Sequence, residues 1–180
     1  MKIIYPPTIY NPLETEVCCF MAGGMGNIDW HTEFLNHLKL FDFNYLVIYN
    51  PYNPNITDHS EQVNWEFNCL SLYKNANFIF SIYFDKYSTQ PVSMYELGRM
   101  LALKDSKHLS VQLDGVNICG ATLNHDFPVV VSIHEDAPCK EDILKQCQLV
   151  SATAKVRTPK EHAVEVMAKY KFLRQYMKAI

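Results

Sequence analysis

Short apolar runs alternate along the chain with longer stretches in which apolar residues recur every three or four positions. The short runs predict buried strands, and the longer stretches predict helices with one apolar face. The predicted strands cover residues 16–22, 45–49, 77–84, 127–133 and 152–156. The predicted helices cover residues 30–40, 62–74, 93–104, 140–150 and 158–180. Within the second helix, the spacing predicts that Val63, Phe67 and Leu70 face the core.

This alternation is typical of an α/β fold with helices on both faces of a parallel sheet. The simplest such fold is a flavodoxin-like, doubly wound sheet of five parallel strands in the order 2-1-3-4-5. Residues 106–126 interrupt the pattern, and their Asp114-Gly115 pair predicts a small inserted hairpin. Residues 1–15 are rich in proline and are expected to form a surface arm. Because we find no internal repeat or linker, we interpret residues 1–180 as a single domain.

The composition narrows the class of protein. Hydrophobic residues make up 48% of the 180 residues and charged residues 19%, as in a globular protein with a full core. A net charge of −3 argues against a partner that is polymeric nucleic acid, which needs a basic face. The six cysteines form no C-x-x-C pair, so we expect reduced thiols. Without an apolar segment of signal-peptide or bilayer length, we expect a cytoplasmic protein with no membrane contact.

The strongest candidate for chemistry is Glu96. It follows the third predicted strand and lies near the start of the third predicted helix, at the sheet edge where open α/β sheets bind ligands. The field of the helix terminus is expected to keep its carboxylate ionised, as the nucleophile of a retaining sugar transfer requires. The alternative is structural, because Ser93 and Glu96 have the spacing of a capping box.

A glycine-rich loop, residues 23–26, connects the first strand to the first helix. Glycines at this position let a ligand approach the backbone amides of the helix terminus. The loop matches neither the dinucleotide-binding nor the P-loop motif, and a tight turn would need the same glycines. Both interpretations stay open at this point.

Several segments together resemble the nucleoside 2-deoxyribosyltransferase family, and most closely its deoxyribosyltransferase-like branch. The resemblance covers about residues 17–150. The matching segments are Phe20-Met21-Ala22-Gly23-Gly24-Met25-Gly26 with Asp29-Trp30, Asn50-Pro51, Gln62-Val63-Asn64-Trp65-Glu66-Phe67, residues 77–84, Gln90-Pro91-Val92-Ser93-Met94-Tyr95-Glu96-Leu97-Gly98 and residues 132–146. The resemblance implies a flavodoxin-like fold, a homo-oligomer, and transfer of 2-deoxyribose between nucleobases through a glycosyl intermediate on Glu96.

The partners implied are a small nucleoside or nucleotide and a free nucleobase. We expect no metal and no other cofactor, since the histidines are scattered without metal-ligand spacing. The candidate catalytic residues are Glu96, Asn77 and Asp85. The candidate substrate-binding residues are Gly23, Gly24, Asp29, Trp30, Asn50, Glu66, Gln90 and Tyr95. Structural alternatives are a helix cap for Asp29, core packing for Trp30 and Tyr95, and a solvated charge for Glu66.

The chain departs from the family pattern at positions where family members often have an acidic residue that manages the proton on the leaving base. Asn77 and Gln90 stand where the family often has acidic residues, and an amide cannot supply a proton at neutral pH. The loop after Asn50-Pro51 also lacks the arginines common in the family. Standard transfer, hydrolysis of the N-glycosidic bond, and nucleotide binding without catalysis are therefore all consistent with the sequence.

Overall fold

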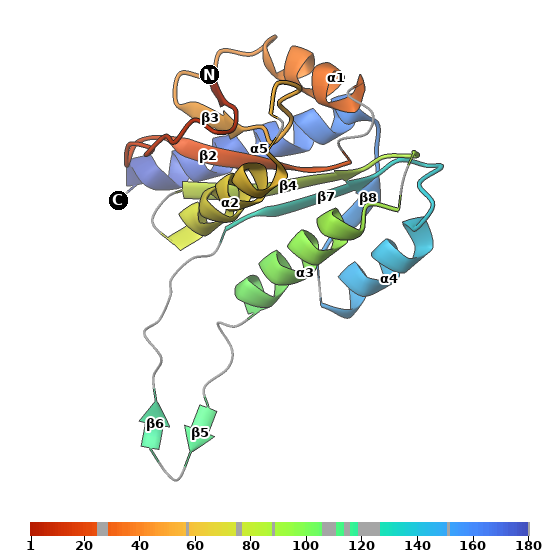
Figure 1. Ribbon diagram of the computed structural model, residues 1–180. Coiled ribbons are helices and arrows are strands. Elements are labelled where there is room, and N and C mark those ends of the chain that lie inside the picture. The colour runs from red at the N-terminus through yellow and green to blue at the C-terminus, as the bar shows by residue number, and fades with distance from the viewer. Residues whose placement is uncertain are drawn as a thin grey trace.

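A six-stranded, all-parallel sheet forms the centre of the computed structural model (Figure 1). The structure describes residues 1–24, 29–56, 58–74, 77–87, 89–105, 111–113, 116–118, 127–150 and 152–179. The strands follow the order β1 (Lys2–Ile4), β3 (Leu46–Tyr49), β2 (Val17–Gly23), β4 (Asn77–Phe84), β7 (Val129–Ile133) and β8 (Ala154–Val156). The chain is therefore an α/β protein, as the alternation of strands and helices predicts.

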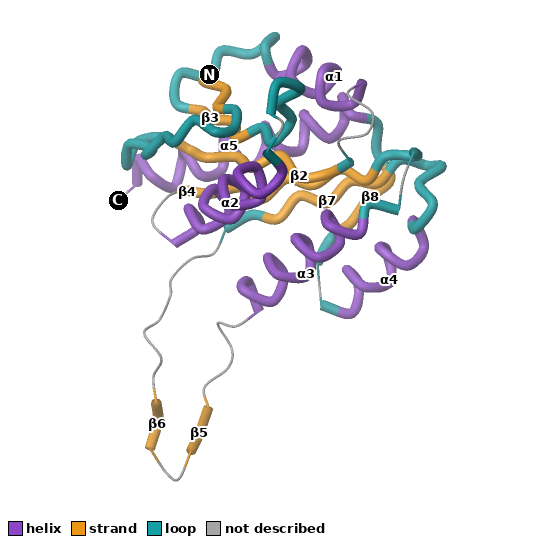
Figure 2. The backbone as a smooth tube through the Cα atoms, in the orientation of Figure 1, coloured by secondary structure: helices purple, strands orange, loops and turns teal. Residues whose placement is uncertain are grey.

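Helices cover both faces of the sheet (Figure 2). The helices of the described residues are α1 (Asp29–Leu38), α2 (His59–Leu70), α3 (Pro91–Asp105), α4 (Lys140–Leu149) and α5 (Pro159–Ala179), and a 3-10 turn (Ser71–Lys74) extends α2. One core lies between the sheet and α1 and α5, and a second core lies between the sheet and α2, α3 and α4.

The central strands are mostly apolar because both of their faces are covered. Alternate side chains of β2 enter opposite cores: Cys18 packs with α2, α3 and α4, and Cys19 packs with α1 and α5. Burial raises the pKa of the Cys18 thiol to about 12 and raises that of Cys19 as well. The five described cysteines form no disulfide with one another.

The predictions of five strands and of a wholly surface arm were wrong. Residues Lys2–Ile4 of that arm form β1, which pairs in parallel with β3 at the edge of the sheet. The order of the whole sheet therefore differs from the prediction, although the other five strands lie side by side as β3-β2-β4-β7-β8. Three residues are too few to show a periodicity, which is why β1 was missed.

The predicted insertion contains an antiparallel pair, β5 (Val111–Leu113) and β6 (Val116–Ile118). The Asp114-Gly115 pair that was predicted to form its turn lies outside the described residues. None of the described helices is both long enough and apolar enough to cross a membrane.

Candidate functional site

A cavity of about 200 Å³ opens at the carboxyl end of β2, between α2 and the start of α3. Its lining includes Gly23 and Gly24 at the end of β2 and Glu66 from α2. It also includes Gln90, which immediately precedes α3, and Glu96 within α3. These five residues were all predicted as site residues from the sequence. The structure therefore brings together groups that lie far apart in the chain, at the sheet edge that binds ligands in open α/β folds.

The two glycines allow close packing behind this cavity. Gly23 has a φ of +143°, and a Cβ atom there would clash with the Tyr83 carbonyl and the Trp30 ring. A Cβ atom on Gly24 would clash with the side chains of Asp85 and Gln90. Packing alone therefore explains both glycines, and the rest of the loop, residues 25–28, lies outside the described residues.

Glu96 lies in the second turn of α3, because the helix begins at Pro91. Ser93 is inside the helix and cannot be its N-cap, so the capping-box alternative is wrong. The Glu96 side chain is largely buried and lines the cavity. Among the described residues, no hydrogen-bond partner of its carboxyl group is found.

The expectation that Glu96 is ionised in the free protein was also wrong. Burial raises its pKa to about 8, repulsion from Glu66 adds to the rise, and Arg99 lowers it only in part. The favourable field of the helix terminus falls off within the first turn, and Glu96 lies beyond it. The environment of the free cavity therefore favours the protonated form of Glu96.

Glu66 supplies the second carboxyl group of the cavity. Burial raises its pKa as well, while Gln62 and His59 act in the opposite direction. The Gln62 amide donates a hydrogen bond to Glu66 Oε1 at 3.0 Å and so fixes the orientation of this carboxyl group. Two interacting carboxyl groups in one cavity tend to hold a single shared proton, which makes an acid and a base available together.

Gln90 has an unusual backbone and an unusual side chain. Its φ is +48°, a left-handed value that is uncommon for residues other than glycine. The side chain is buried, and Nε2 donates to the Asp85 carbonyl over 3.5 Å. Within the described part of the chain, Gln90 Oε1 has no hydrogen-bond partner. A buried, unpaired acceptor in the wall of a cavity is suited to an N–H or O–H donor of a ligand.

Three other predicted residues lie behind the cavity rather than in its lining. Asp85 is buried, accepts a hydrogen bond from the Tyr87 amide at 2.8 Å, and packs against Gly24. Asn50 Oδ1 accepts from the Tyr52 amide at 3.0 Å and lies 3.2 Å from His31 Nδ1. Trp30 stacks on Tyr83 in the core, and its indole donates to the Gly24 carbonyl at 2.9 Å. These residues position the cavity wall.

The structure does not bring Asn77 or Tyr95 to the cavity. Asn77 is the first residue of β4, at the opposite end of the strand, and its amide donates to the Glu14 carbonyl at 3.2 Å. Tyr95 is 74% exposed on the outer face of α3. Asp29 begins α1, and its side chain lies outside the described part of the structure. His59 and Gln62 are among the lining residues that were not predicted from the sequence, although Gln62 lies one helical turn before Glu66.

No group of three or more histidine, cysteine, aspartate or glutamate side chains that could hold a metal ion occurs among the described residues. Compared with protein-family models, the chain matches none, and no curated protein sequence matches it.

Proposed function

We propose that this cavity is the active site of an enzyme that transfers 2-deoxyribose from a nucleoside to a second nucleobase, through a glycosyl ester on Glu96. The observation that carries the proposal is the pairing of a buried carboxyl group, Glu96, with a half-buried one, Glu66, in one cavity at the carboxyl edge of a parallel sheet. The resemblance to nucleoside 2-deoxyribosyltransferases independently assigns the nucleophile to Glu96. The order β3-β2-β4-β7-β8 also fits the flavodoxin-like arrangement of that family, with β1 added outside it.

The shared proton divides the roles of the two carboxyl groups. When Glu66 holds the proton, Glu96 is ionised and can attack C1′ of the bound nucleoside. The C1′–N bond breaks, its electron pair goes to the base nitrogen, and Glu66 gives its proton to the leaving base. Glu66 thus takes the role of proton donor. Asn77, which stands where the family often has an acidic residue, cannot take this role because it lies at the other end of β4.

The second half of the reaction reverses these steps. A nitrogen of the incoming base attacks C1′, the ester bond to Glu96 breaks, and Glu66 takes up the proton that the base loses. Gln90 Oε1 is suited to accept a hydrogen bond from the base or the sugar. The cavity volume of about 200 Å³ favours a nucleoside over a larger dinucleotide. The resemblance further implies that the enzyme works as a homo-oligomer.

The test is to mix the protein with a deoxynucleoside and a different free base, and to separate the products by chromatography. A new deoxynucleoside supports transfer. Free base with free deoxyribose would instead show hydrolysis, and neither product, with a rise in thermal stability on adding the nucleoside, would show binding alone.

The variants Glu96→Ala and Glu66→Gln locate the activity. Glu96→Ala is expected to reduce turnover by at least about 10³-fold, because the covalent route is lost. Glu61→Gln is the matched control for Glu66→Gln, because Glu61 lies on the same helix but does not line this cavity. Undiminished turnover in Glu96→Ala would exclude Glu96 as the nucleophile.

A further inference from the structure

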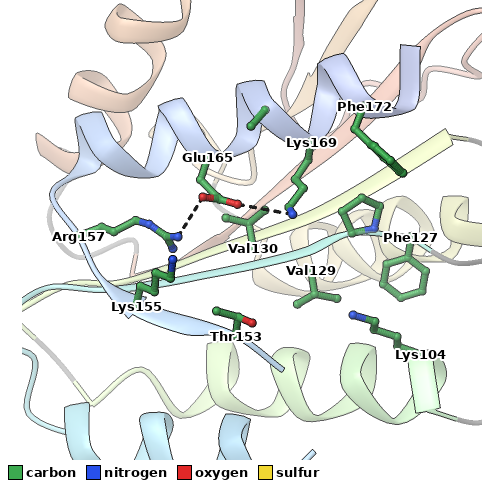
Figure 3. A pocket seen from close by; sticks show the side chains of 12 residues that line it. Lys104, Phe127, Val129, Val130, Thr153, Lys155, Arg157, Glu165, Lys169 and Phe172 are labelled. Carbon is green, nitrogen blue, oxygen red and sulfur yellow. Dashed lines mark hydrogen bonds and ion pairs between the residues drawn. The ribbon is translucent and has the colours of Figure 1, made fainter. Parts of the chain in front are cut away.

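A second cavity, of about 550 Å³, lies between α5, the start of β7, the edge strand β8 and the last turn of α3 (Figure 3). It shares no lining residue with the cavity that contains Glu96. The inference drawn from it is independent of the proposed function.

Basic side chains dominate the charged part of this second cavity. Lys104, Lys155, Arg157 and Lys169 line it, and Glu165 is the single carboxylate among its lining residues. This surplus of positive charge is local, because the whole chain carries a net charge of −3. In Figure 3 the amino group of Lys155 lies beside the Arg157 guanidinium at one end of the cavity, and the amino group of Lys104 points inward from the opposite end.

Glu165 is already paired with two of the four cations. It lies 3.0 Å from Arg157 and 3.6 Å from Lys169. Within the described part of the chain, Lys104 and Lys155 have no carboxylate partner. Two positively charged groups are therefore available to an anionic ligand.

Arg157 is held in place before any ligand binds. Its guanidinium donates to the Val131 carbonyl at 3.2 Å, to Ser132 Oγ at 3.1 Å and to Glu165 at 3.0 Å. A rigid cation at one end of the cavity lowers the entropic cost of fixing a ligand there.

The other end of the cavity carries two aromatic side chains, with Lys104 beside Phe127. Phe127 and Phe172 line it, and the Phe172 side chain is 62% exposed although its ring is large and hydrophobic. In Figure 3 both rings lie on the side away from Arg157. An exposed aromatic ring beside a basic hollow is suited to stack against a planar group.

We propose that this second cavity binds a small phosphorylated molecule with a planar ring, of the nucleotide class. Lys155 contacts the phosphates at the end where Arg157 is held, and the ring packs against Phe172 and Phe127 at the other end, where Lys104 adds a second positive charge. Lysine and arginine side chains are the usual partners of phosphate, and a volume of about 550 Å³ lies within the range of about 300–1,000 Å³ typical of small-ligand sites. A concave site with a surplus of a few charges suits such a ligand better than a polymer, which needs an extended basic face.

Calorimetric titration of the whole protein with adenosine diphosphate and with pyrophosphate, in phosphate-free buffer, tests the proposal. We expect saturable binding of adenosine diphosphate that weakens as salt is raised. The double variant Lys104→Met/Lys155→Met is expected to weaken binding at least tenfold. Lys171→Met, an exposed change on α5 outside the cavity, is expected to leave the affinity unchanged.

Two further comparisons separate this site from its alternatives. Phe172→Ala is expected to weaken adenosine diphosphate but not pyrophosphate, because only the nucleotide has a ring. Glu96→Gln is expected to leave the affinity for adenosine diphosphate unchanged, whatever it does to catalysis. The proposal is overturned if no saturable binding occurs, if Glu96→Gln abolishes binding while the double lysine variant does not, or if a short oligoglutamate binds more tightly than the nucleotide.

Discussion

At the scale of single residues, the buried carboxyl group of Glu96 lowers the stability of the folded protein when it is ionised. The side chain is only 8% exposed, has a neighbouring carboxyl group, and has no hydrogen-bond partner among the described residues. Ionising it in the folded protein is therefore costly, whereas ionising it in the unfolded chain is not. The proposed nucleophile is consequently a local weakness of the free protein.

This weakness predicts a pH-dependent gain in stability for Glu96→Gln. Because burial raises the pKa of Glu96 from 4.5 to about 8, the folded protein binds more protons than the unfolded chain between these values. The contribution of Glu96 to stability is thus lost as the pH rises through this window. We expect the variant to gain a few degrees in Tm over the wild type at pH 9 and little at pH 4, measured by calorimetry.

Glu61→Gln provides the control, because Glu61 is exposed. Its Tm difference from the wild type is measured at the same two pH values. Equal Tm differences for Glu96→Gln at the two pH values would contradict the raised pKa of Glu96.

At the scale of elements, the sequence predicts which segments are strands and helices better than it predicts how they face. The pattern in α2 predicted that Val63 and Phe67 face the core, yet they are 51% and 57% exposed. Trp65 and Cys69 face the core instead, and the guanidinium of Arg99 covers the Phe67 ring at 4.5 Å. Which face of α2 is buried depends on how the helix lies beside the cavity. The local periodicity of the sequence does not predict that placement.

At the candidate site too, the sequence predicts which residues lie near the ligand-binding edge better than it predicts which of them line the cavity. Glu66, Gln90 and Glu96 could be predicted because they lie on or just before helices at the ligand-binding edge. Trp30, Asn50 and Asp85 are at this edge too, but they pack behind the cavity. The sequence does not predict whether a residue at this edge lines the cavity or lies beneath its wall. Asn77 was assigned from the resemblance alone, and it lies at the opposite end of β4.

Replacement by alanine is expected to have opposite effects at Gly24 in the cavity wall and at Gly98 in α3. Gly24→Ala would press a Cβ atom against Asp85 and Gln90, and we expect a loss of about 1–3 kcal/mol, or roughly 2–10 °C in Tm. Gly98→Ala is the matched control, because its Cβ atom would meet open space on α3. It is expected to stabilise the protein by about 0.5–1 kcal/mol. Thermal unfolding of both variants checks the pair, and a neutral Gly24→Ala would contradict the close packing.

At the scale of the whole molecule, a buried polar network fastens α5 to the sheet. His162 Nε2 lies 2.8 Å from Ser81 Oγ on β4, and His162 Nδ1 lies 2.7 Å from Ser132 Oγ on β7. Both ring nitrogens are thus used in contacts that suit the neutral imidazole, and burial lowers the pKa of His162 to about 3.

The His162 network predicts that acid loosens the packing of α5 on the sheet. Because the pKa of His162 is lowered from 6.5 to about 3, the unfolded chain binds the extra proton first as the pH falls, and folding loses stability below pH 6.5. From pH 7 to pH 5 this group alone costs about 2 kcal/mol.

Urea unfolding at pH 7 and pH 5 measures this cost. His162→Phe should be less stable than the wild type at pH 7 but should lose less stability on acidification. His37→Gln, a change of a half-buried histidine on α1, serves as the comparison variant. An equal loss in the wild type and in His162→Phe would show that His162 does not carry the acid sensitivity.

The neighbouring thiols of β2 have a practical consequence. Cys18 and Cys19 are adjacent in sequence, yet each is sealed beneath a different layer of helices. A reagent that alkylates thiols can reach Cys19 only when α1 and α5 lift away, and Cys18 only when the opposite layer does. Mass spectrometry of partly alkylated protein would therefore record, from one peptide, which side of the sheet opens first.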